Sequence, residues 1–136
     1  IIVEQYISAD GKAAPDVKFT CYRGECLFAL AHMDRFTNHR NAFFTPDWRR
    51  IDNLWEAPSY EGDIPAPPRL NEMVSIAQKI ASHFKLSRID FLVTADRFYI
   101  GEITFSTHNA HRKFIRPETE DVRYFMSRVE SARKAA

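Results

Sequence analysis

The stretch at residues 88–105 reads RIDFLVTADRFYIGEITF and contains two apolar-rich runs separated by a short polar turn. Residues 88–94 and 98–105 predict two strands, and Ala95, Asp96 and Arg97 predict the loop between them. Strands joined by so short a loop run antiparallel. The stretch therefore predicts a β-hairpin, and it is the most informative piece of the sequence.

Two acidic residues of this hairpin face each other if the loop has three residues. In that register Thr94 pairs with Phe98, and Asp90 stands directly opposite Glu102. The Cβ atoms of directly opposed residues lie about 4.5–5.5 Å apart, and like charges in such a pair destabilise a sheet. A loop of different parity would place the two carboxylates on opposite faces.

Something must offset the repulsion if Asp90 and Glu102 face each other. The candidates are a hard cation such as Mg²⁺, a bridging arginine, or protonation of one carboxyl group. Arg88 and Thr104 share this face, because alternate residues of a strand point to the same side, and both suit contacts with phosphate and metal-bound water. The simpler alternative is a solvated outer face that carries ordinary charges.

Two helices are predicted elsewhere in the chain. Apolar residues at spacings of three and four predict a helix over residues 70–84. Pro117 is typical of a helix start and predicts a final helix. The apolar residues expected to face inward from this final helix are Val122, Phe125, Met126 and Val129.

Further strands are predicted before the first helix. Residues 1–7 read as a strand, and residues 16–23 and 26–33 read as a hairpin. Residues 34–55 read as irregular, and the proline-rich residues 57–68 as an extended connection. This order of elements indicates an α+β fold with a mainly antiparallel sheet and flanking helices, not a parallel doubly wound sheet.

Size and charge narrow the function classes. The 136 residues suit one domain, and 19 Lys and Arg against 18 Asp and Glu give a net charge of +1, which argues against nucleic acid as a partner. The longest apolar run, residues 26–33, is far too short to span a membrane, and no secretion signal precedes it. We therefore expect a cytoplasmic protein without a membrane span.

The basic and aromatic residues 35–50 permit three interpretations. Aromatic side chains among arginines suit a nucleic-acid surface, but the balanced overall charge speaks against it. A site for phosphate or another anionic substrate would use Arg35, His39 or Arg40. An ordered surface loop is the third possibility.

The two cysteines lie on either side of the first predicted hairpin turn. If Arg23-Gly24 is a two-residue loop, Cys21 and Cys26 face each other across the strands. In a reducing cytoplasm we expect buried thiols at these positions and not a disulfide.

Five segments of the sequence, in order, resemble the TupA-like ATP-grasp family, which is associated with teichuronopeptide and other cell-surface polysaccharide biosynthesis. RIDFLV followed by FYIGEITF resembles the closing hairpin of ATP-grasp enzymes, in which an Asp on one strand and a Glu on the next hold the Mg²⁺ of ATP. The other four segments are IIVEQYI at 1–7, PDVKFTCYRGE at 15–25, DRFTNHRNAFFTPDW at 34–48 and LNEMVSIAQKI at 70–80. Together they are spread along the chain from residue 1 to residue 105.

The resemblance implies a catalytic and a metal-binding set. Asp90 and Glu102 look like the Mg²⁺ ligands, and Arg88 looks like the arginine that steadies the transferred phosphoryl group. Lys18 and Arg35 are candidates for contact with phosphate or acyl phosphate.

The resemblance also implies a nucleotide-binding set. The segment from Glu4 through Gln5 and Tyr6 to Ile7 resembles the connection between the two ATP-grasp subdomains, where the backbone hydrogen-bonds adenine. Asp16 falls where such enzymes often place an acidic residue near the ribose. The implied cofactors are ATP and Mg²⁺.

The implied function is an ATP- and Mg²⁺-dependent, ligase-like enzyme that activates a small-molecule or saccharide-linked carboxylate. Two features depart from the wider ATP-grasp pattern. Thr104 replaces an Asn, as is usual in the TupA-like branch, and STHNAH at 106–111 replaces a proline- and glycine-rich turn. The alternatives are a non-catalytic or truncated ATP-grasp remnant that acts as a binding partner, and a glycosyltransferase-associated polysaccharide biosynthesis protein.

The resemblance places residues 1–136 as a single domain, the second half of an ATP-grasp catalytic unit. The chain opens directly on the apolar residues IIV, and the lysine-bearing N-terminal subdomain of such enzymes has no counterpart in the sequence. We expect about 100 or more residues before Ile1 in the natural protein. The isolated chain is accordingly expected to be inactive and to bind ATP weakly.

Overall fold

The computed structural model describes residues 1, 3, 5–34, 38–51 and 60–105, and six residues between 123 and 134. The strands in these ranges are β1 (Ser8–Ala9), β2 (Lys12–Ala13), β3 (Asp16–Tyr22), β4 (Glu25–Met33), β5 (Arg40–Phe44), β6 (Arg50–Ile51), β7 (Leu86–Val93) and β8 (Phe98–Thr104). The helix α1 spans Leu70–Ala81.

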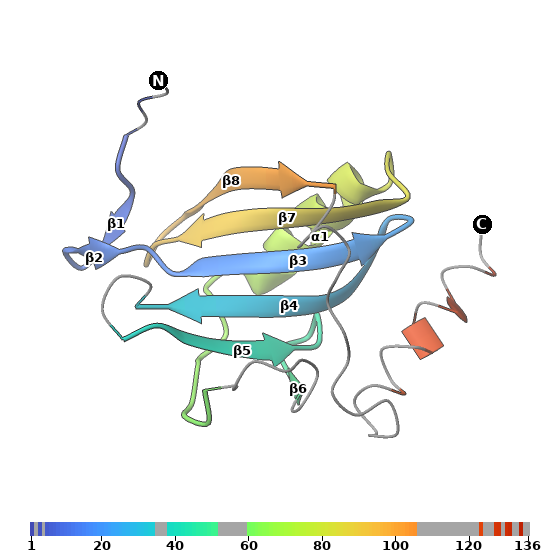
Figure 1. The fold of residues 1–136 in the computed structure, drawn as a ribbon, viewed down its shortest axis with the longest axis horizontal. Helices are drawn as coiled ribbons and strands as arrows, with labels where there is room; N and C mark the ends of the chain where they lie inside the picture. The colour runs from blue at the N-terminus through green and yellow to red at the C-terminus, as the bar shows by residue number, and fades with distance from the viewer. Residues whose placement is uncertain are drawn as a thin grey trace.

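Six strands form one antiparallel sheet in the order β6-β5-β4-β3-β7-β8, and β1 and β2 form a separate small hairpin. Helix α1 packs against one face of the sheet, behind β7 and β3 in Figure 1. We call this the inner face and the opposite one the outer face. The predicted α+β class with a mainly antiparallel sheet is confirmed.

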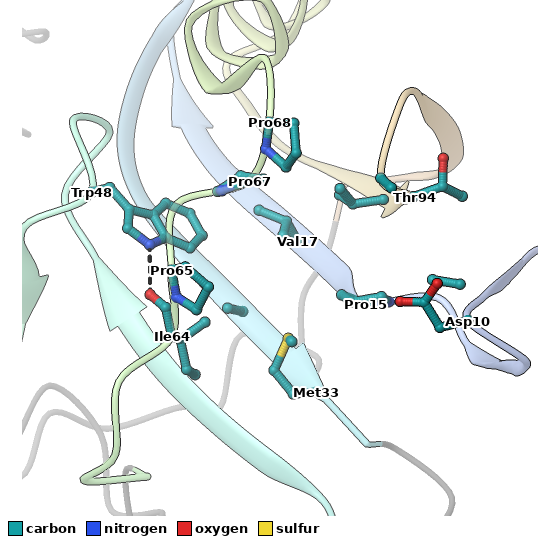
Figure 2. A pocket seen from close by; sticks show the side chains of 14 residues that line it. Asp10, Pro15, Val17, Met33, Trp48, Ile64, Pro65, Pro67, Pro68 and Thr94 are labelled. Atoms are coloured by element: carbon teal, nitrogen blue, oxygen red, sulfur yellow. Dashed lines mark hydrogen bonds between the residues drawn. The ribbon is translucent and has the colours of Figure 1, made fainter.

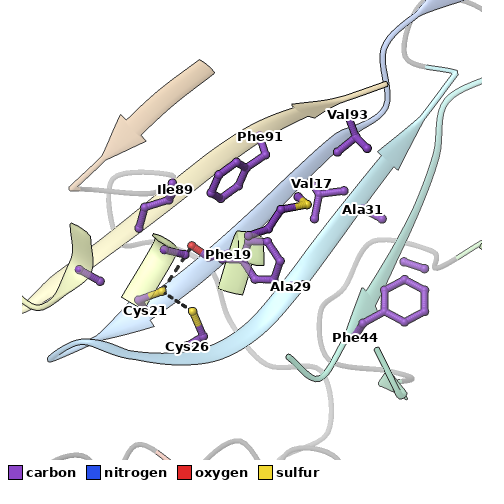
Figure 3. Close-up of a cluster of buried hydrophobic side chains, with 14 of the residues drawn as sticks. Val17, Phe19, Cys21, Cys26, Ala29, Ala31, Phe44, Ile89, Phe91 and Val93 are labelled. Carbon is purple, nitrogen blue, oxygen red and sulfur yellow. Dashed lines mark hydrogen bonds between the residues drawn. The ribbon is translucent and has the colours of Figure 1, made fainter. Parts of the chain in front are cut away.

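The main core lies between α1 and the inner face (Figure 3). Helix α1 contributes Met73, Ala77 and Ala81, which are fully buried and spaced four residues apart. Phe19 and Phe91 from the central strands meet edge to face, with ring centroids 5.8 Å apart. The predicted helix is confirmed, although it ends three residues before the predicted residue 84.

A smaller apolar cluster covers part of the outer face. Leu30 of β4 pairs with Lys18 of β3, so the two side chains point to the same, outer side of the sheet. The cluster occupies the β4–β6 half of this face and consists of Leu27, Phe28, Leu30, Phe43 and Ile51, with Tyr22 packed against it. The β3, β7 and β8 part of the outer face has a different character, described below.

The first hairpin has the predicted two-residue turn. Arg23 and Gly24 both have positive φ angles, 52° and 82°, as a type I′ turn requires. Cys21 pairs with Cys26 in this register, both are free and fully buried, and their Sγ atoms lie 2.9 Å apart (Figure 3). The predicted pair of buried thiols is confirmed. The hydrogen bond with Cys26, together with burial, raises the pKa of Cys21.

Two predicted segments differ from the structure. The described residues of 1–7 are not in a strand; Ile7 accepts a backbone hydrogen bond from Ala14, and regular strand pairing begins at Ser8. Residues 34–55, predicted as irregular, contain β5 and β6. In β5 the inner-facing Phe44 and the outer-facing Phe43 are both buried, so the strand lacks the alternating pattern that would have revealed it.

The predicted C-terminal helix is seen only in part. The six described residues of this region, Arg123, Ser127, Arg128, Glu130, Ser131 and Lys134, have helical backbone. The predicted start at Pro117 and the predicted inward-facing residues lie outside the described residues. No helix in the described ranges is long and apolar enough to cross a membrane.

Candidate functional site

The second hairpin places the two predicted carboxylates opposite each other, but its loop length and strand register differ from the prediction. Val93 pairs with Phe98, so the loop has four residues, not the predicted three. A bulge follows, because Phe91 pairs with Ile100 whereas Asp90 pairs with Glu102. The extra residue in the loop and the bulge cancel, and the predicted facing of Asp90 and Glu102 is confirmed.

The extra residue in the bulge is Gly101 of β8. A bulge leaves one residue unpaired and re-aims the side chains beside it. The next pair after the bulge is Asp90 with Glu102, followed two residues on by Arg88 with Thr104. Because residues two apart in a strand share a face, all four side chains project from the outer face.

Strand β3 completes the site from the other side of β7. Lys18 pairs with Asp90, and Asp16 lies two residues before Lys18 on the same face. The outer face over β3, β7 and β8 therefore carries six polar side chains, which we call the charged cluster. Its members are Asp16, Lys18, Arg88, Asp90, Glu102 and Thr104.

Asp90 is the centre of the charged cluster. The Arg88 guanidinium donates from Nε to Asp90 Oδ1 at 2.6 Å and from Nη2 to Oδ2 at 2.7 Å. Lys18 Nζ donates to the same Oδ2 at 2.5 Å and forms an ion pair with Asp16 Oδ2 at 2.6 Å. The two cations thus hold both oxygens of Asp90.

Glu102 is held more loosely than Asp90. Its Oε1 accepts a hydrogen bond from Thr104 Oγ1 at 2.7 Å, and its Oε2 lies 3.8 Å from Arg88 Nη2. Arg88 also donates to Thr104 Oγ1 at 3.1 Å. The Glu102 side chain is 60% exposed, whereas that of Asp90 is only 5% exposed.

The structure shows how the two facing carboxylates coexist. Of the three candidates considered from the sequence, a bridging arginine is present: Arg88 lies between Asp90 and Glu102. The hydrogen bond with Asp90 raises the pKa of Arg88 above its already high usual value, so the guanidinium stays charged. Lys18 adds a second positive charge on the β3 side.

The donor chemistry of the charged cluster fits a hard divalent cation. Mg²⁺ prefers carboxylate oxygens and keeps several waters, so Asp90 and the exposed Glu102 suffice as protein ligands. Among the described residues, no three His, Cys, Asp or Glu side chains are placed so as to hold a metal by themselves. Lys18 Nζ lies beside Oδ2 of Asp90, so a cation that binds this oxygen would compete with the ammonium group.

The predicted adenine-binding segment lies elsewhere. Gln5 and Tyr6 are exposed, Tyr6 to 67%, and Ile7 is half-buried. Figure 1 shows the N-terminal end running away from the six-stranded sheet beyond β1. The structure brings Lys18, Arg88, Asp90 and Glu102 together with Asp16, but not with Gln5, Tyr6 and Ile7. The predicted site residues Glu4 and Arg35 lie outside the described residues.

Sequence reasoning missed a histidine beside the charged cluster. His32 of β4 pairs with Asp16, so it shares the outer face. Its ring stacks on that of His39 with centroids 4.9 Å apart, and Nδ1 of His32 lies 2.6 Å from Nε2 of His39. A bulge between Thr20 and Cys21 shifts the register by one residue. Without that bulge the turn would set Asp16 opposite Ala31, so the sequence offered no signal for His32.

A separate apolar cavity lies on the inner face (Figure 2). Its volume is about 200 Å³, and its walls include Val17, Met33, Trp48, Val93 and the prolines at 65, 67 and 68. Trp48 donates from Nε1 to the carbonyl oxygen of Ile64 at 3.0 Å, which closes one wall. Because Val17 and Val93 point away from the face of Lys18, the sheet separates this cavity from the charged cluster.

Comparison with known proteins agrees with this architecture. The match to a family model places the chain in the ATP-grasp class. More specifically, the chain belongs to the TupA-like ATP-grasp family, whose family model matches residues 1–123.

Two solved structures of the ATP-grasp ligase PsnB are similar to the chain at low identity. The complex with a phosphomimetic variant of a minimal precursor, Mg and ADP has 10% identity and a TM-score of 0.46, and the match covers 89% of this chain and 34% of that one. The complex with the minimal precursor has 11% identity and a TM-score of 0.44, covering 86% and 34%. This chain thus spans about a third of the length of those structures. No curated protein matches the sequence.

Proposed function

We propose that this chain supplies the Mg²⁺- and phosphate-binding part of an ATP-dependent, ligase-like enzyme that activates a carboxylate for cell-surface polysaccharide biosynthesis. The observation that carries the proposal is the facing pair of Asp90 and Glu102, set among the cations Arg88 and Lys18 on one face of a TupA-like ATP-grasp domain. Residues 1–136 would then form the second half of the catalytic unit, and a preceding subdomain would complete the phosphate site.

In this proposal Asp90 and Glu102 hold Mg²⁺. A bound Mg²⁺ neutralises phosphate charge and stabilises the charge that develops on the transferred group. Arg88 keeps a fixed, fully charged guanidinium at the edge of the metal site, where its fork geometry suits phosphoryl oxygens. Lys18 and Arg35 serve as further contacts to phosphate or acyl phosphate.

The nucleotide base and sugar are assigned to the N-terminal segment. Backbone groups from Glu4 through Gln5 and Tyr6 to Ile7 bind adenine in this proposal, which is compatible with the exposure of Tyr6. Asp16 is directed to the ribose. Its ion pair with Lys18 would link the ribose and phosphate ends of the bound nucleotide.

The reaction proposed has two steps. A substrate carboxylate oxygen attacks the terminal phosphorus of ATP, so an acyl phosphate forms and ADP leaves. An amine or another nucleophile then attacks the acyl carbon, the new bond forms, and inorganic phosphate leaves with the electron pair of the broken carbon–oxygen bond. The substrate class is a small-molecule or saccharide-linked carboxylate.

The test is trapping of the acyl phosphate by hydroxylamine in the full-length natural protein with candidate carboxylates and Mg-ATP. We expect Asp90→Asn and Glu102→Gln each to abolish hydroxamate formation. Asp96→Asn is the matched control, because Asp96 is an exposed carboxylate of the same hairpin that pairs with its sequence neighbours Arg97 and Thr94. Full turnover in either cluster variant would contradict the assignment, and binding of Mg-ATP without any turnover would favour the non-catalytic remnant.

A further inference from the structure

Lys18 lies against a carboxylate oxygen of Asp90 that is a candidate ligand for a metal ion. Its Nζ lies 2.5 Å from Asp90 Oδ2 and 2.6 Å from Asp16 Oδ2, so one ammonium group bridges two carboxylates. Mg²⁺ binds carboxylate oxygens at about 2.0–2.1 Å and would compete for the same oxygen. Arg88 Nη2 already donates to this oxygen as well, so a divalent cation that arrived there beside both groups would be strongly repelled by the nearby ammonium charge.

The two cations on Asp90 differ in how easily they can leave. Arg88 makes two hydrogen bonds to Asp90 and a third to Thr104, which fixes its planar group. Lys18 ends in a compact charge on a flexible four-carbon stem, and its side chain is 14% exposed. Lys18 is therefore the group that can move away from Asp90 without dismantling the rest of the cluster.

The charges of the cluster make this movement depend on an anion. Three carboxylates face Lys18 and Arg88, so a lysine that left Asp90 for water would give up two close ion pairs at a nearly buried site. A nucleotide phosphate next to the site would give the ammonium group a new negatively charged partner in place of Asp90. A metal that arrives alone offers Lys18 no such partner.

We infer that Lys18 is a placeholder for the metal: its ammonium group neutralises Asp90 until a metal ion binds there. This exchange couples cation binding to nucleotide binding. In the empty site its ammonium group neutralises Asp90 and Asp16; when a nucleoside phosphate binds, Lys18 moves to the phosphate and opens Asp90 to the metal. This inference rests on the proposed function and adds an order of events to it: the free divalent cation binds poorly, and nucleotide and metal bind together.

The experiment measures binding of Mn²⁺ by electron paramagnetic resonance, with and without ADP, to the full-length natural protein that contains these 136 residues. Wild-type protein should bind Mn²⁺ weakly alone and more tightly with ADP. Lys18→Met should bind Mn²⁺ alone about tenfold or more tightly than wild type, because an adjacent cation lowers the proton affinity of a carboxylate by at least that factor and repels a metal cation in the same way. The gain from ADP should shrink in this variant.

Two controls separate the placeholder role from a general loss of charge. Lys79→Met removes an exposed lysine of α1, on the other side of the sheet, and should behave as wild type. Lys18→Arg keeps the positive charge and should retain the dependence on ADP. If Lys18→Met is unfolded without metal, Mn²⁺ alone should restore its thermal unfolding transition.

The outcomes distinguish this inference from the proposed function. If wild type binds Mn²⁺ with ADP but Lys18→Met binds Mn²⁺ alone no more tightly than wild type, the placeholder role is wrong and the nucleotide site stands. An equal gain in Lys79→Met, or an unfolded Lys18→Met that Mn²⁺ does not restore, also overturns it. If wild type binds no Mn²⁺ even with ADP, the proposed function fails first.

Discussion

Strands β3 and β7 present opposite chemistry on their two faces. Toward α1 they bury Phe19, Ile89 and Phe91 completely, while on the outer side the neighbouring Asp16 and Asp90 are almost as inaccessible. Burial of apolar surface stabilises a fold directly. Buried charges must first recover the cost of their dehydration through ion pairs and hydrogen bonds. The inner face therefore carries the stability of the domain, and the outer face carries charges that are useful for binding but are stable only as a set.

The largest expected effect is on the inner face. Phe91→Ala should lower the free energy of unfolding by about 3–5 kcal/mol, because the ring is fully buried and its removal leaves a cavity. The ring also loses its edge-to-face contacts with Phe19 and Phe98. Urea unfolding followed by circular dichroism measures the change. Phe105→Ala, which removes a ring that is 55% exposed, is the control and should cost far less.

The second effect tests whether the outer face is stable only as a set. Asp90→Asn should lower the free energy of unfolding by about 2–3 kcal/mol, since Lys18 and Arg88 would keep their charges in a nearly buried site without this carboxylate. From the sequence alone, repulsion between Asp90 and Glu102 suggested that this change would be neutral or slightly stabilising. The contacts of Arg88 and Lys18 reverse that expectation. A variant as stable as wild type in urea would show that repulsion dominates after all.

A change of pH tests the inner face without changing any of its side chains, because the thiol of Cys21 is buried there. Because folding raises the pKa of Cys21 above the usual 9.0 of a thiol, the folded protein holds this proton longer than the unfolded chain does. The stability from this group is complete below pH 9 and is lost as the pH rises. Above pH 9 we expect the loss to steepen toward about 1.4 kcal/mol per pH unit. Cys21→Ala should show a correspondingly smaller slope; an identical slope would assign the alkaline loss to other groups.

The smallest effect is expected at the exposed end of the charged cluster. Glu102→Gln should change the free energy of unfolding by less than about 0.5 kcal/mol, because the side chain is mostly solvated and its contact with Arg88 is long. The informative quantity is the difference between the losses of unfolding free energy in Glu102→Gln and Asp90→Asn. A loss as large as that of Asp90→Asn would mean that both carboxylates share one buried network.

The local parts of this architecture could be predicted from the sequence, and the distant parts could not. The facing of Asp90 and Glu102 depends on residues within a single hairpin, although the predicted loop was one residue short and the bulge at Gly101 restored the register. Lys18 and Asp90 are 72 residues apart, and nothing in the sequence says that β3 lies beside β7. The contact of Lys18 with Asp90 therefore could not be predicted until the order of the strands was known.

Strand β5 was missed in the sequence for a different reason. Periodicity reveals a strand when one face is buried and the other is solvated. Phe43 packs into the outer apolar cluster and Phe44 into the main core, so both faces of β5 are buried. Burial of both faces thus removed the alternating pattern that a strand with one solvated face would show.

The most direct test of the central claim is whether the outer charged face, and not the inner cavity, binds the metal nucleotide. Calorimetric titration of the full-length natural protein with Mn²⁺ at high ADP concentration should show binding for wild type and for the control Asp96→Asn. Asp90→Asn should weaken that binding by about tenfold or more, since it removes the charge that the metal needs. Equal affinity of wild type and a folded Asp90→Asn would contradict the assignment of the charged cluster as the nucleotide–metal site.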